Sequence, residues 1–354
     1  MSDPSVYIGT YTRAEGHVDG KAEGIIKVEI NKKNGALSSP VTVAKIINPS
    51  FINKSSDGKY LFAVSELGPG DDKHGEVFSY EILENDSLKL IDVASTDAHA
   101  PCYVVSDSLG KHIFIANYLD GVAKMIKVDN GKFVKSDTII LKGGSVHPQQ
   151  FGALLHHITF SKDEKKIYIT DKGSDKIWLI DIDHENTKFL RESISSVSIQ
   201  AGAGPRHLEF TSDYKYAYTM NELDNMINCF SVQNDGRLVR VGKISALPFD
   251  FKGESYGAEI KILNSDYVYV SNRGHNSIAA FKINKDNGHL SLVDYYPSKG
   301  HYPRSFEIDP EGKFLYVANQ NSNNIIQFSI NHKSGELSLT ENELKVGTPV
   351  DIQF

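Results

Sequence analysis

Short runs of alternating large apolar and smaller residues recur along the whole chain. Clear examples read YLFAV, HIFIAN, KIYIT, YAYTM, YVYVSN and FLYVAN, at residues 60–64, 112–117, 166–170, 216–220, 267–272 and 314–319. Alternation with a period of two is the pattern of strands that bury one face. Helix-period patterns are scarce by comparison. The sequence therefore predicts an all-β fold.

Each run is the second strand of a longer repeated unit. The unit opens with a marker residue, usually proline, which is followed by one apolar strand, a turn and the alternating run. The markers are Pro49, Pro101, Leu155, Pro205, Gly257, Pro303 and Pro349. They recur at intervals of 46 to 54 residues, and such a period is typical of a β-propeller. A third strand and an Asn-Gly, Asp-Gly or Ser-Gly turn follow each pair, which indicates four strands per unit.

The two ends of the chain supply a seventh unit. The C-terminal segment TPVDIQF has the pattern of an opening strand, and SVYIGTY near the N-terminus has the pattern of a second strand. Pairing of these two segments would close the ring and remove exposed sheet edges. We therefore predict that residues 1–354 form a single seven-bladed β-propeller domain with four antiparallel strands per blade. An open β-solenoid or two sandwiches are the alternatives.

Composition and charge narrow the classes of function. Hydrophobic residues make up 40% of the chain and the net charge is −7, so the chain can form a core and lacks the basic excess of a nucleic-acid binder. Its two cysteines, Cys102 and Cys229, form no Cys-x-x-Cys pair, which argues against a thiolate metal site or a disulfide framework. No apolar run of 18 residues and no signal-peptide start are present. We therefore expect a cytoplasmic protein that binds neither nucleic acid nor membranes.

Two positions of every unit are expected to meet at one rim of the ring. In an antiparallel hairpin the start of the first strand lies beside the end of the second. The residue after each marker therefore lies near the residue sixteen or seventeen positions past the marker. Among these positions are Glu66, Tyr118, His156, Arg206, Glu222, Arg273, Arg304 and Gln320.

The arginines give this rim its chemistry. Only seven of the 38 basic residues are arginines, and Arg206, Arg273 and Arg304 are all placed at the rim. Planar guanidinium groups suit bidentate recognition of carboxylate or phosphate. The sequence thus predicts a binding site for a small anion. The alternative is that these arginines bridge blades or pair with Glu66 and Glu222.

Two adjacent histidines begin the inner strand of the third full unit. Successive side chains of a strand point to opposite sides, so we expect only one of them to face the mouth, and register with Arg206 favours His156 over His157. A neutral imidazole beside arginines suits a general base, whereas a hydrogen-bonded structural histidine is the alternative. His147 and Gln149, in an insertion before this strand, are expected to lean over the mouth. No histidines have a metal-ligand spacing there, so we expect neither metal nor cofactor.

Several segments together resemble the seven-bladed propeller lactonases. These segments read VYIGTYT, NPSF, VSEL, IANY, GAGPRH, MNEL, SNRG and YPRSFEIDPEGKFLYVANQ, and the resemblance runs from end to end. The family includes bacterial 6-phosphogluconolactonase of the propeller type and fungal carboxy-cis,cis-muconate cyclase. In the cyclase branch, catalysis is assigned to a histidine, two arginines and a glutamate. The resemblance implies these roles for His156, Arg206, Glu222 and Arg273.

The chain departs from the family pattern at two points. Leu154-Leu155-His156-His157 stands where many relatives have His-x-His, and Asp171-Lys172-Gly173 stands where many have Asp-Leu-Gly.

The resulting hypothesis is a lactonase, with 6-phosphogluconolactone of the pentose phosphate pathway as the expected substrate. Arg206 and Arg273 would stabilise the tetrahedral oxyanion, His156 would activate water, and Glu222 would orient it or accept a proton. The expected substrate-binding residues are His157, Arg304, Glu66, Tyr118 and Gln320. A lactonising cycloisomerase and a non-catalytic interaction propeller are the alternatives. A small anionic lactone is the expected partner of a monomer or weak homo-oligomer.

Overall fold

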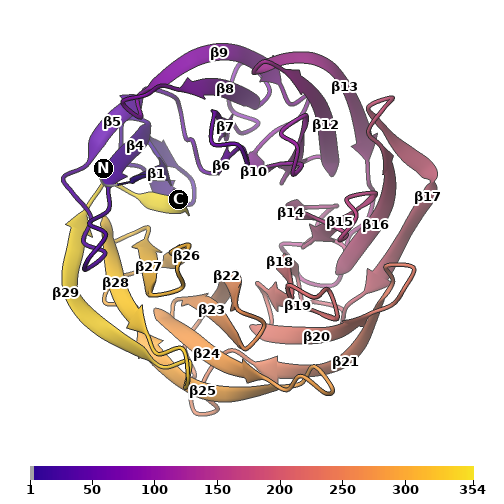
Figure 1. Cartoon of the computed structure of the whole chain (residues 1–354). Helices are drawn as coiled ribbons and strands as arrows, with labels where there is room; N and C mark the ends of the chain where they lie inside the picture. Colours follow the sequence, from indigo (N-terminus) through magenta and orange to yellow (C-terminus); the bar gives the residue numbers. More distant parts are fainter. Residues whose placement is uncertain (1–3) are drawn as a thin grey trace.

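The computed structural model describes residues 4–354, which form strands and no helix (Figure 1). Seven four-stranded antiparallel sheets lie around a central axis like blades. Residues 1–3, part of the segment in which the sequence predicts no leader peptide, lie outside the described range.

Each blade runs from an inner strand beside the central axis to an outer strand at the outer circumference of the ring. The blade that joins the chain ends holds β30 (Pro349–Gln353), β1 (Ser5–Thr10), β4 (Ile25–Glu29) and β5 (Val41–Ala44). The second blade holds β6 (Ile52–Lys54), β7 (Tyr60–Ser65), β8 (Glu76–Ile82) and β9 (Leu88–Ser95). The third holds β10 (Pro101–Ser106), β11 (His112–Asn117), β12 (Val122–Asp129) and β13 (Lys132–Ile140). The fourth holds β14 (Leu155–Phe160), β15 (Lys166–Asp171), β16 (Lys176–Asp183) and β17 (Lys188–Ser198).

The remaining three blades repeat this order. The fifth holds β18 (Pro205–Phe210), β19 (Tyr216–Asn221), β20 (Met226–Val232) and β21 (Leu238–Ser245). The sixth holds β22 (Tyr256–Leu263), β23 (Tyr267–Arg273), β24 (Ser277–Ile283) and β25 (Leu290–Pro297). The seventh holds β26 (Pro303–Ile308), β27 (Phe314–Asn319), β28 (Asn324–Ile330) and β29 (Leu337–Lys345). A short hairpin of β2 (Ala14–Glu15) and β3 (Val18–Asp19) lies outside the blades.

The two chain ends close the ring, as the sequence predicts. Strand β30 pairs antiparallel with β1, so that Ile352 lies opposite Ile8 and Gln353 opposite Tyr7. Figure 1 shows both ends in one blade. The seven-bladed propeller is thereby confirmed, and the open solenoid and the sandwich pair are wrong.

The alternating runs form the core between neighbouring blades. Between the third and fourth blades, for example, Phe114, Ile158, Ile169 and Phe189 are buried in one cluster. Each face of a twisted blade packs on a neighbouring blade, so the apolar side chains on that face are buried away from water. The repeat of about fifty residues is therefore also the repeat of the core.

Tyrosines of the second strands tie each blade to the next. The hydroxyl of Tyr168 donates to the carbonyl of Gly236, that of Tyr218 to Gly288, and that of Tyr269 to Gly335. The acceptor glycines lie in the outer turns that the sequence marks by Asp-Gly, Asn-Gly and Ser-Gly. Gly335 has a φ of 73°, and a Cβ there would collide with the ring of Tyr267. These turns thus need glycine both for their backbone conformation and for close packing between blades.

A β-bulge interrupts the start of six of the seven inner strands. The register shifts between Pro101 and Tyr103, and shifts of the same kind occur in β14, β18, β22, β26 and β30. In five blades the extra residue directly follows the marker: Cys102, His156, Arg206, Arg304 and Val350. A bulge re-aims its extra side chain and is common beside active sites.

Candidate active site

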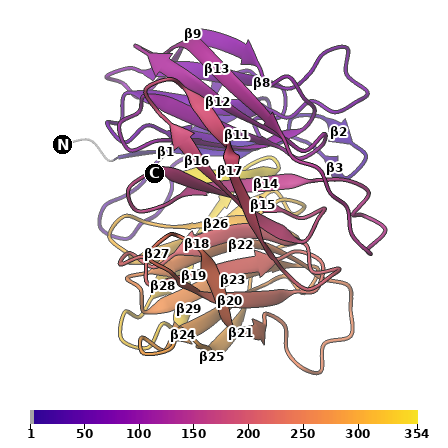
Figure 2. The same ribbon diagram turned by 90° about the vertical axis from the view of Figure 1, so that its right-hand side faces the viewer.

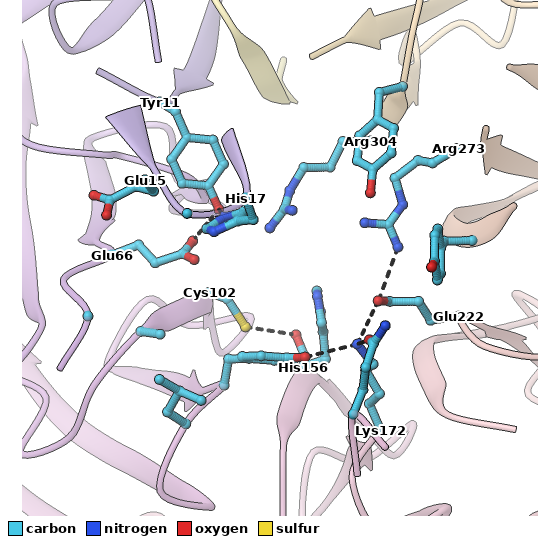
Figure 3. Close-up of a pocket in the computed structure, with 18 of the residues that line it drawn as sticks. Tyr11, Glu15, His17, Glu66, Cys102, His156, Lys172, Glu222, Arg273 and Arg304 are labelled. Carbon is cyan, nitrogen blue, oxygen red and sulfur yellow. Dashed lines mark hydrogen bonds and ion pairs between the residues drawn. The ribbon is translucent and has the colours of Figure 1, made fainter. Parts of the chain in front are cut away.

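A cavity of about 530 Å³ lies where the inner strands begin and the second strands end (Figure 3). Figure 2 shows β2, β3 and several long loops projecting from one side of the ring, away from the N-terminus. Glu15, Gly16 and His17 of this hairpin line the cavity together with rim residues. The cavity volume falls within the roughly 300–1,000 Å³ range of small-molecule sites.

Six of the nine residues proposed from the sequence line this cavity. They are Glu66, Tyr118, His156, Glu222, Arg273 and Arg304. The other three, Arg206, His157 and Gln320, are buried and do not line it. The rim positions thus converge as expected, whereas the depth of each side chain differs from blade to blade. The catalytic and binding roles of all nine stay predictions.

Glu222 follows β19 and lies at the centre of a cationic cluster. Its Oε1 accepts a hydrogen bond from Lys172 Nζ at 2.7 Å, and its Oε2 lies 3.1 Å from Arg273 Nη2 and 3.5 Å from Arg206 Nε. Burial raises the pKa of Glu222, but the attraction of Arg273, Lys172 and Arg206 outweighs it and holds the pKa below its ordinary value. We call these four residues the Glu222 cluster, and it carries a net charge of +2.

Lys172 was not proposed as a site residue, although it marks one of the departures from the family pattern. Besides Glu222, its ammonium group donates to Tyr118 Oη at 2.9 Å and to Gln149 Oε1 at 3.0 Å. Burial lowers the pKa of Lys172, but Glu222 and Tyr118 outweigh it, so the pKa is raised. Gln149 lines the cavity as expected. His147 does not line it and instead accepts a hydrogen bond from the backbone of Gln149 at 3.2 Å.

Arg206 lies behind Glu222. Its Nη1 is 3.2 Å from His207 Nε2, and its Nε has no hydrogen-bond partner in the described chain. Burial and the neighbouring Arg273 and Arg304 lower the pKa of Arg206 to about 9. Arg206 therefore acts on the cavity through Glu222 and through its positive charge.

Two arginines from neighbouring blades face the cavity. Arg273 ends β23, donates to the Gly257 carbonyl at 2.8 Å and lies 5.3 Å from the ring centre of Tyr302. Arg304 lies 5.4 Å from the ring centre of Tyr11. Among residues 4–354, no hydrogen bond or ion pair engages the guanidinium of Arg304, and Figure 3 shows it pointing into the cavity. Arg304 thus offers a free set of donors to a ligand.

His156 is the extra residue of the bulge in β14, and the bulge turns it into the cavity. Neither of its ring nitrogens is hydrogen-bonded to a described residue, and Nδ1 is buried. Burial, Arg206 and His207 hold the pKa of His156 well below its usual value, so the ring is neutral. A neutral imidazole with a free lone pair can accept a proton from water.

His157 takes a different place. Its ring packs against Tyr103 and His207, at centroid distances of 4.4 and 4.7 Å. His207 Nδ1 in turn lies 2.7 Å from Glu259 Oε1. His156 therefore lines the cavity and His157 does not, as register with Arg206 predicts, although a bulge rather than simple strand alternation directs the two side chains.

Several lining residues are not among the site residues proposed from the sequence, although the repeat places Tyr11 at a rim position. Tyr11 donates from its hydroxyl to Glu66 Oε2 at 2.8 Å, and His17 Nε2 lies 3.4 Å from the same hydroxyl. Glu15 and His17 come from the β2–β3 hairpin, which is an insertion in one blade only. Because no other unit contains this hairpin, the repeat could not place it over the mouth.

The donor set of this cavity is cationic rather than metal-binding. Within residues 4–354, the one group of histidine and carboxylate atoms with metal-ligand spacing lies elsewhere, between the third and fourth blades. None of the described residues belongs to a helix that is long and apolar enough to cross a membrane.

The comparisons with known proteins agree with the fold and the cavity. Residues 5–354 match the family model described as lactonase, seven-bladed β-propeller. A 6-phosphogluconolactonase of Formosa agariphila is 34% identical over 87% of each chain, and one of Bacillus subtilis is 31% identical over 87% of this chain and 86% of its own. A periplasmic gluconolactonase of Pseudomonas aeruginosa has a solved structure that is 28% identical, covers 99% of this chain and 98% of its own, and superimposes with a TM-score of 0.92. The resemblance seen in the sequence is thus confirmed, and the chain belongs to the seven-bladed β-propeller lactonase family.

Proposed function

We propose that this lactonase hydrolyses 6-phosphogluconolactone to 6-phosphogluconate, a step of the pentose phosphate pathway. The observation that carries the proposal is Arg304, whose guanidinium faces the cavity beside the Tyr11 ring and has no hydrogen bond or ion pair to residues 4–354. A dianionic phosphate is the kind of group that such a guanidinium binds. Two curated relatives bear the name of this activity.

The positive charge around Glu222 and Arg304 supports an anionic substrate. The Glu222 cluster keeps a net charge of +2 after its internal pairing, and Arg304 adds one more positive charge. Two negative charges also line the cavity, Glu15, which is paired with Arg13, and Glu66. The cationic groups are fixed before a ligand binds, so they offer preorganised stabilisation to developing negative charge. Arg273, which lines the cavity, is the group we assign to the tetrahedral oxyanion.

His156 is the group we assign to water activation. His156 takes a proton as water attacks the lactone carbonyl. The resulting imidazolium returns that proton to the ring oxygen when the tetrahedral intermediate collapses and the ring C–O bond breaks. An anionic substrate beside His156 offsets the arginines that lower its pKa, so binding makes the imidazole a stronger base. Glu222, ionised and clamped by three cations, orients these groups rather than taking up the proton.

Carboxylates and phenols of the cavity lining favour a sugar lactone over a muconate. Glu15, Glu66, Tyr11 and Tyr118 all line the cavity. Their oxygens can accept hydrogen bonds from the hydroxyls of a polyol. A muconolactone has carboxylates and no row of hydroxyls, so carboxylates on the wall would repel it.

The proposal is tested by substrate pairs. We expect Arg304→Ala to reduce kcat/KM for 6-phosphogluconolactone about 10- to 150-fold, the equivalent of about 1.5–3 kcal/mol for hydrogen bonds to a charged group. The same variant should change hydrolysis of unphosphorylated gluconolactone much less. Arg237→Ala, which removes an exposed arginine from an outer turn, is the control.

Two outcomes would overturn the proposal. If Arg304→Ala lowered kcat/KM equally for both lactones, Arg304 would not bind the phosphate group. Turnover of carboxy-cis,cis-muconate, with no lactone hydrolysis, would favour the cycloisomerase, and no turnover of either class would favour an interaction propeller. The cytoplasmic location, the monomeric or weakly oligomeric state and the lack of nucleic-acid or membrane partners are part of the same proposal.

A further inference from the structure

Three potential metal ligands meet between the third and fourth blades. Asp107 lies in the turn between β10 and β11, His112 is the first residue of β11, and His184 lies in the turn between β16 and β17. Asp107 follows the end of β10 that is opposite to the cavity, because the cavity residue Cys102 lies at its start. This group, which we call the His-His-Asp cluster, is therefore separate from the active site.

The spacing of the three ligand atoms is that of a small transition-metal ion. Asp107 Oδ2 lies 3.0 Å from His112 Nδ1 and 3.5 Å from His184 Nδ1, and the two Nδ1 atoms are 3.4 Å apart. Zinc binds nitrogen and oxygen at about 2.0–2.1 Å in a tetrahedron, which places neighbouring ligand atoms about 3.3 Å apart. The three atoms thus outline one face of such a tetrahedron.

We propose that the His-His-Asp cluster binds one divalent ion of the zinc class. Two imidazoles and one carboxylate suit zinc and cobalt, whereas calcium and magnesium prefer all-oxygen sites. The side chains of Asp107 and His112 are 3% and 5% exposed, and that of His184 is 31% exposed. The ion therefore enters past His184, and water occupies the fourth position.

Hydrogen bonds around the cluster direct its lone pairs inward. His184 Nε2 lies 2.7 Å from the carbonyl of Glu164, and a carbonyl only accepts, so Nε2 carries the proton. In the neutral ring Nδ1 is then a free lone pair that faces the other two ligands. Asp107 Oδ1 accepts from the backbone of Lys111 at 2.7 Å, which leaves Oδ2 for the ion. Such outer partners are a regular feature of metal-binding histidines.

His112 has a partner for the proton it must move. Without metal, its Nδ1–H faces Asp107 Oδ2 and its Nε2 lies 3.5 Å from Thr187 Oγ1. When the ion binds Nδ1, the neutral ring takes its other tautomer. The single ring proton then lies on Nε2 and faces the Thr187 hydroxyl, which can accept as well as donate.

The other blades serve as internal comparisons. The backbone N–H of Asp107 donates to the carbonyl of His112, and the same bond marks the matching pair in four other blades. Those pairs are Ser55 and Tyr60, Ser161 and Lys166, Thr211 and Tyr216, and Asp309 and Phe314. The combination of carboxylate and imidazole thus belongs to the third blade alone among these five. An ordinary structural turn does not require it.

A matched control exists in the seventh blade. His332 lies in the turn between β28 and β29, which corresponds to the position of His184 in the fourth blade. The blade before it carries Tyr267 where the third blade carries His112. His332 therefore has the same local setting but no matching imidazole ligand in the preceding blade.

The test uses the full chain after treatment with a chelator, and zinc chloride alone as the probe. We expect calorimetry to show one bound zinc ion and thermal unfolding to move to higher temperature with zinc, since the ion joins two blades. Cobalt should give the visible absorption of a tetrahedral site. His184→Ala should weaken zinc binding at least about tenfold and remove the thermal shift, and His332→Ala should change neither.

A second variant separates loss of a zinc ligand from loss of the folded structure. Asp107→Asn keeps the shape of the side chain and removes its charge, and it should also weaken zinc binding. Zinc binding that is equal in wild type, His184→Ala and Asp107→Asn would overturn the proposal, and so would a wild-type protein that binds no zinc. Lactone hydrolysis should be unchanged by the chelator, so failure of this proposal leaves the proposed lactonase activity untouched.

Discussion

In the Glu222 cluster, loss of the carboxylate should destabilise the protein more than loss of one of the cations. Three buried cations surround one buried carboxylate, and Lys172, Arg206 and Arg273 are 2.7, 3.5 and 3.1 Å from it. At an effective dielectric constant of about 20, these pairs contribute gross attractions of about 6, 5 and 5 kcal/mol. Glu222→Gln removes all three attractions and leaves a net charge of +3. Removal of a partner from a buried ion pair typically costs about 3–5 kcal/mol, and we expect the loss to reach the upper end of that range.

The matched perturbation is Lys172→Met. It removes one attraction of about 6 kcal/mol, but it also removes the repulsion between Lys172 and the two arginines and the cost of burying an ammonium group. Glu222 keeps both arginines as partners. We therefore expect a smaller loss than for Glu222→Gln, of about 1–3 kcal/mol, because Glu222 keeps two cations while Tyr118 Oη and Gln149 Oε1 lose a donor.

Urea unfolding at neutral pH measures both variants and the double variant. Near-native far-UV circular dichroism before denaturation shows that each variant folds. The reasoning is refuted if Lys172→Met destabilises the protein as much as Glu222→Gln does, since the cluster would then hold no surplus of positive charge. In the double variant, we expect part of the Glu222→Gln loss to be recovered.

Three further predictions concern individual residues. His156→Gln should lower kcat for lactone hydrolysis at least about 100-fold with an unchanged melting temperature. The acidic limb of the wild-type profile of kcat/KM against pH should lie below pH 6.5, because the pKa of His156 is lowered. A limb above that pH would contradict the assignment. Burial raises the pKa of Asp351 to about 8, so the stability that the protonated side chain contributes is present at low pH and is lost as the pH rises from about 4 to about 8. Asp351→Asn keeps an acceptor for the Ile52 amide and cannot ionise. In urea melts this variant should be several kcal/mol more stable than wild type at pH 8 and nearly equal to it at pH 4. Gln320→Ala should leave kcat/KM within about twofold, because Gln320 does not line the cavity, and a tenfold loss would show that it does reach the substrate.

The fold could be predicted because it repeats. Seven copies of one apolar pattern fix the strands, the turns and the ring closure, and an error in one copy is corrected by the others. The convergence of rim positions also follows from the repeat, which is why Arg273 and Arg304 were placed together before their contacts were known. Only strand pairing and alternation were needed for this step.

The depth of the side chains could not be predicted in the same way. Register with Arg206 favours His156 over His157 at the mouth, but a bulge adds one residue without changing the hydrophobic pattern. The sequence therefore shows neither the bulge that turns His156 into the cavity nor the packing of His157 on Tyr103. Arg206 and Arg304 occupy equivalent bulges, yet only Arg304 lines the cavity, because Glu222 stands in front of Arg206. Such differences arise from contacts between blades.

Lys172 and the His-His-Asp cluster show a second limit. Lys172 was visible only as a departure from a family pattern, and its partners come from two other blades and a loop. The ligands of the His-His-Asp cluster come from two blades, and Asp107 and His184 are 77 positions apart in the sequence. Motif spacing finds ligands on one element, whereas packed repeats bring together residues that no short motif contains.

The bulge at the head of the inner strands has a consequence for how such proteins diversify. The extra residue takes no partner in the strand ladder, so its identity is free of the constraints that hold the blade together. Exchange of that single side chain alters the chemistry of the mouth and leaves the pairing of the sheet intact. The selectivity of such a ring can therefore change by substitution at positions 102, 156, 206 and 304, while the backbone stays the same.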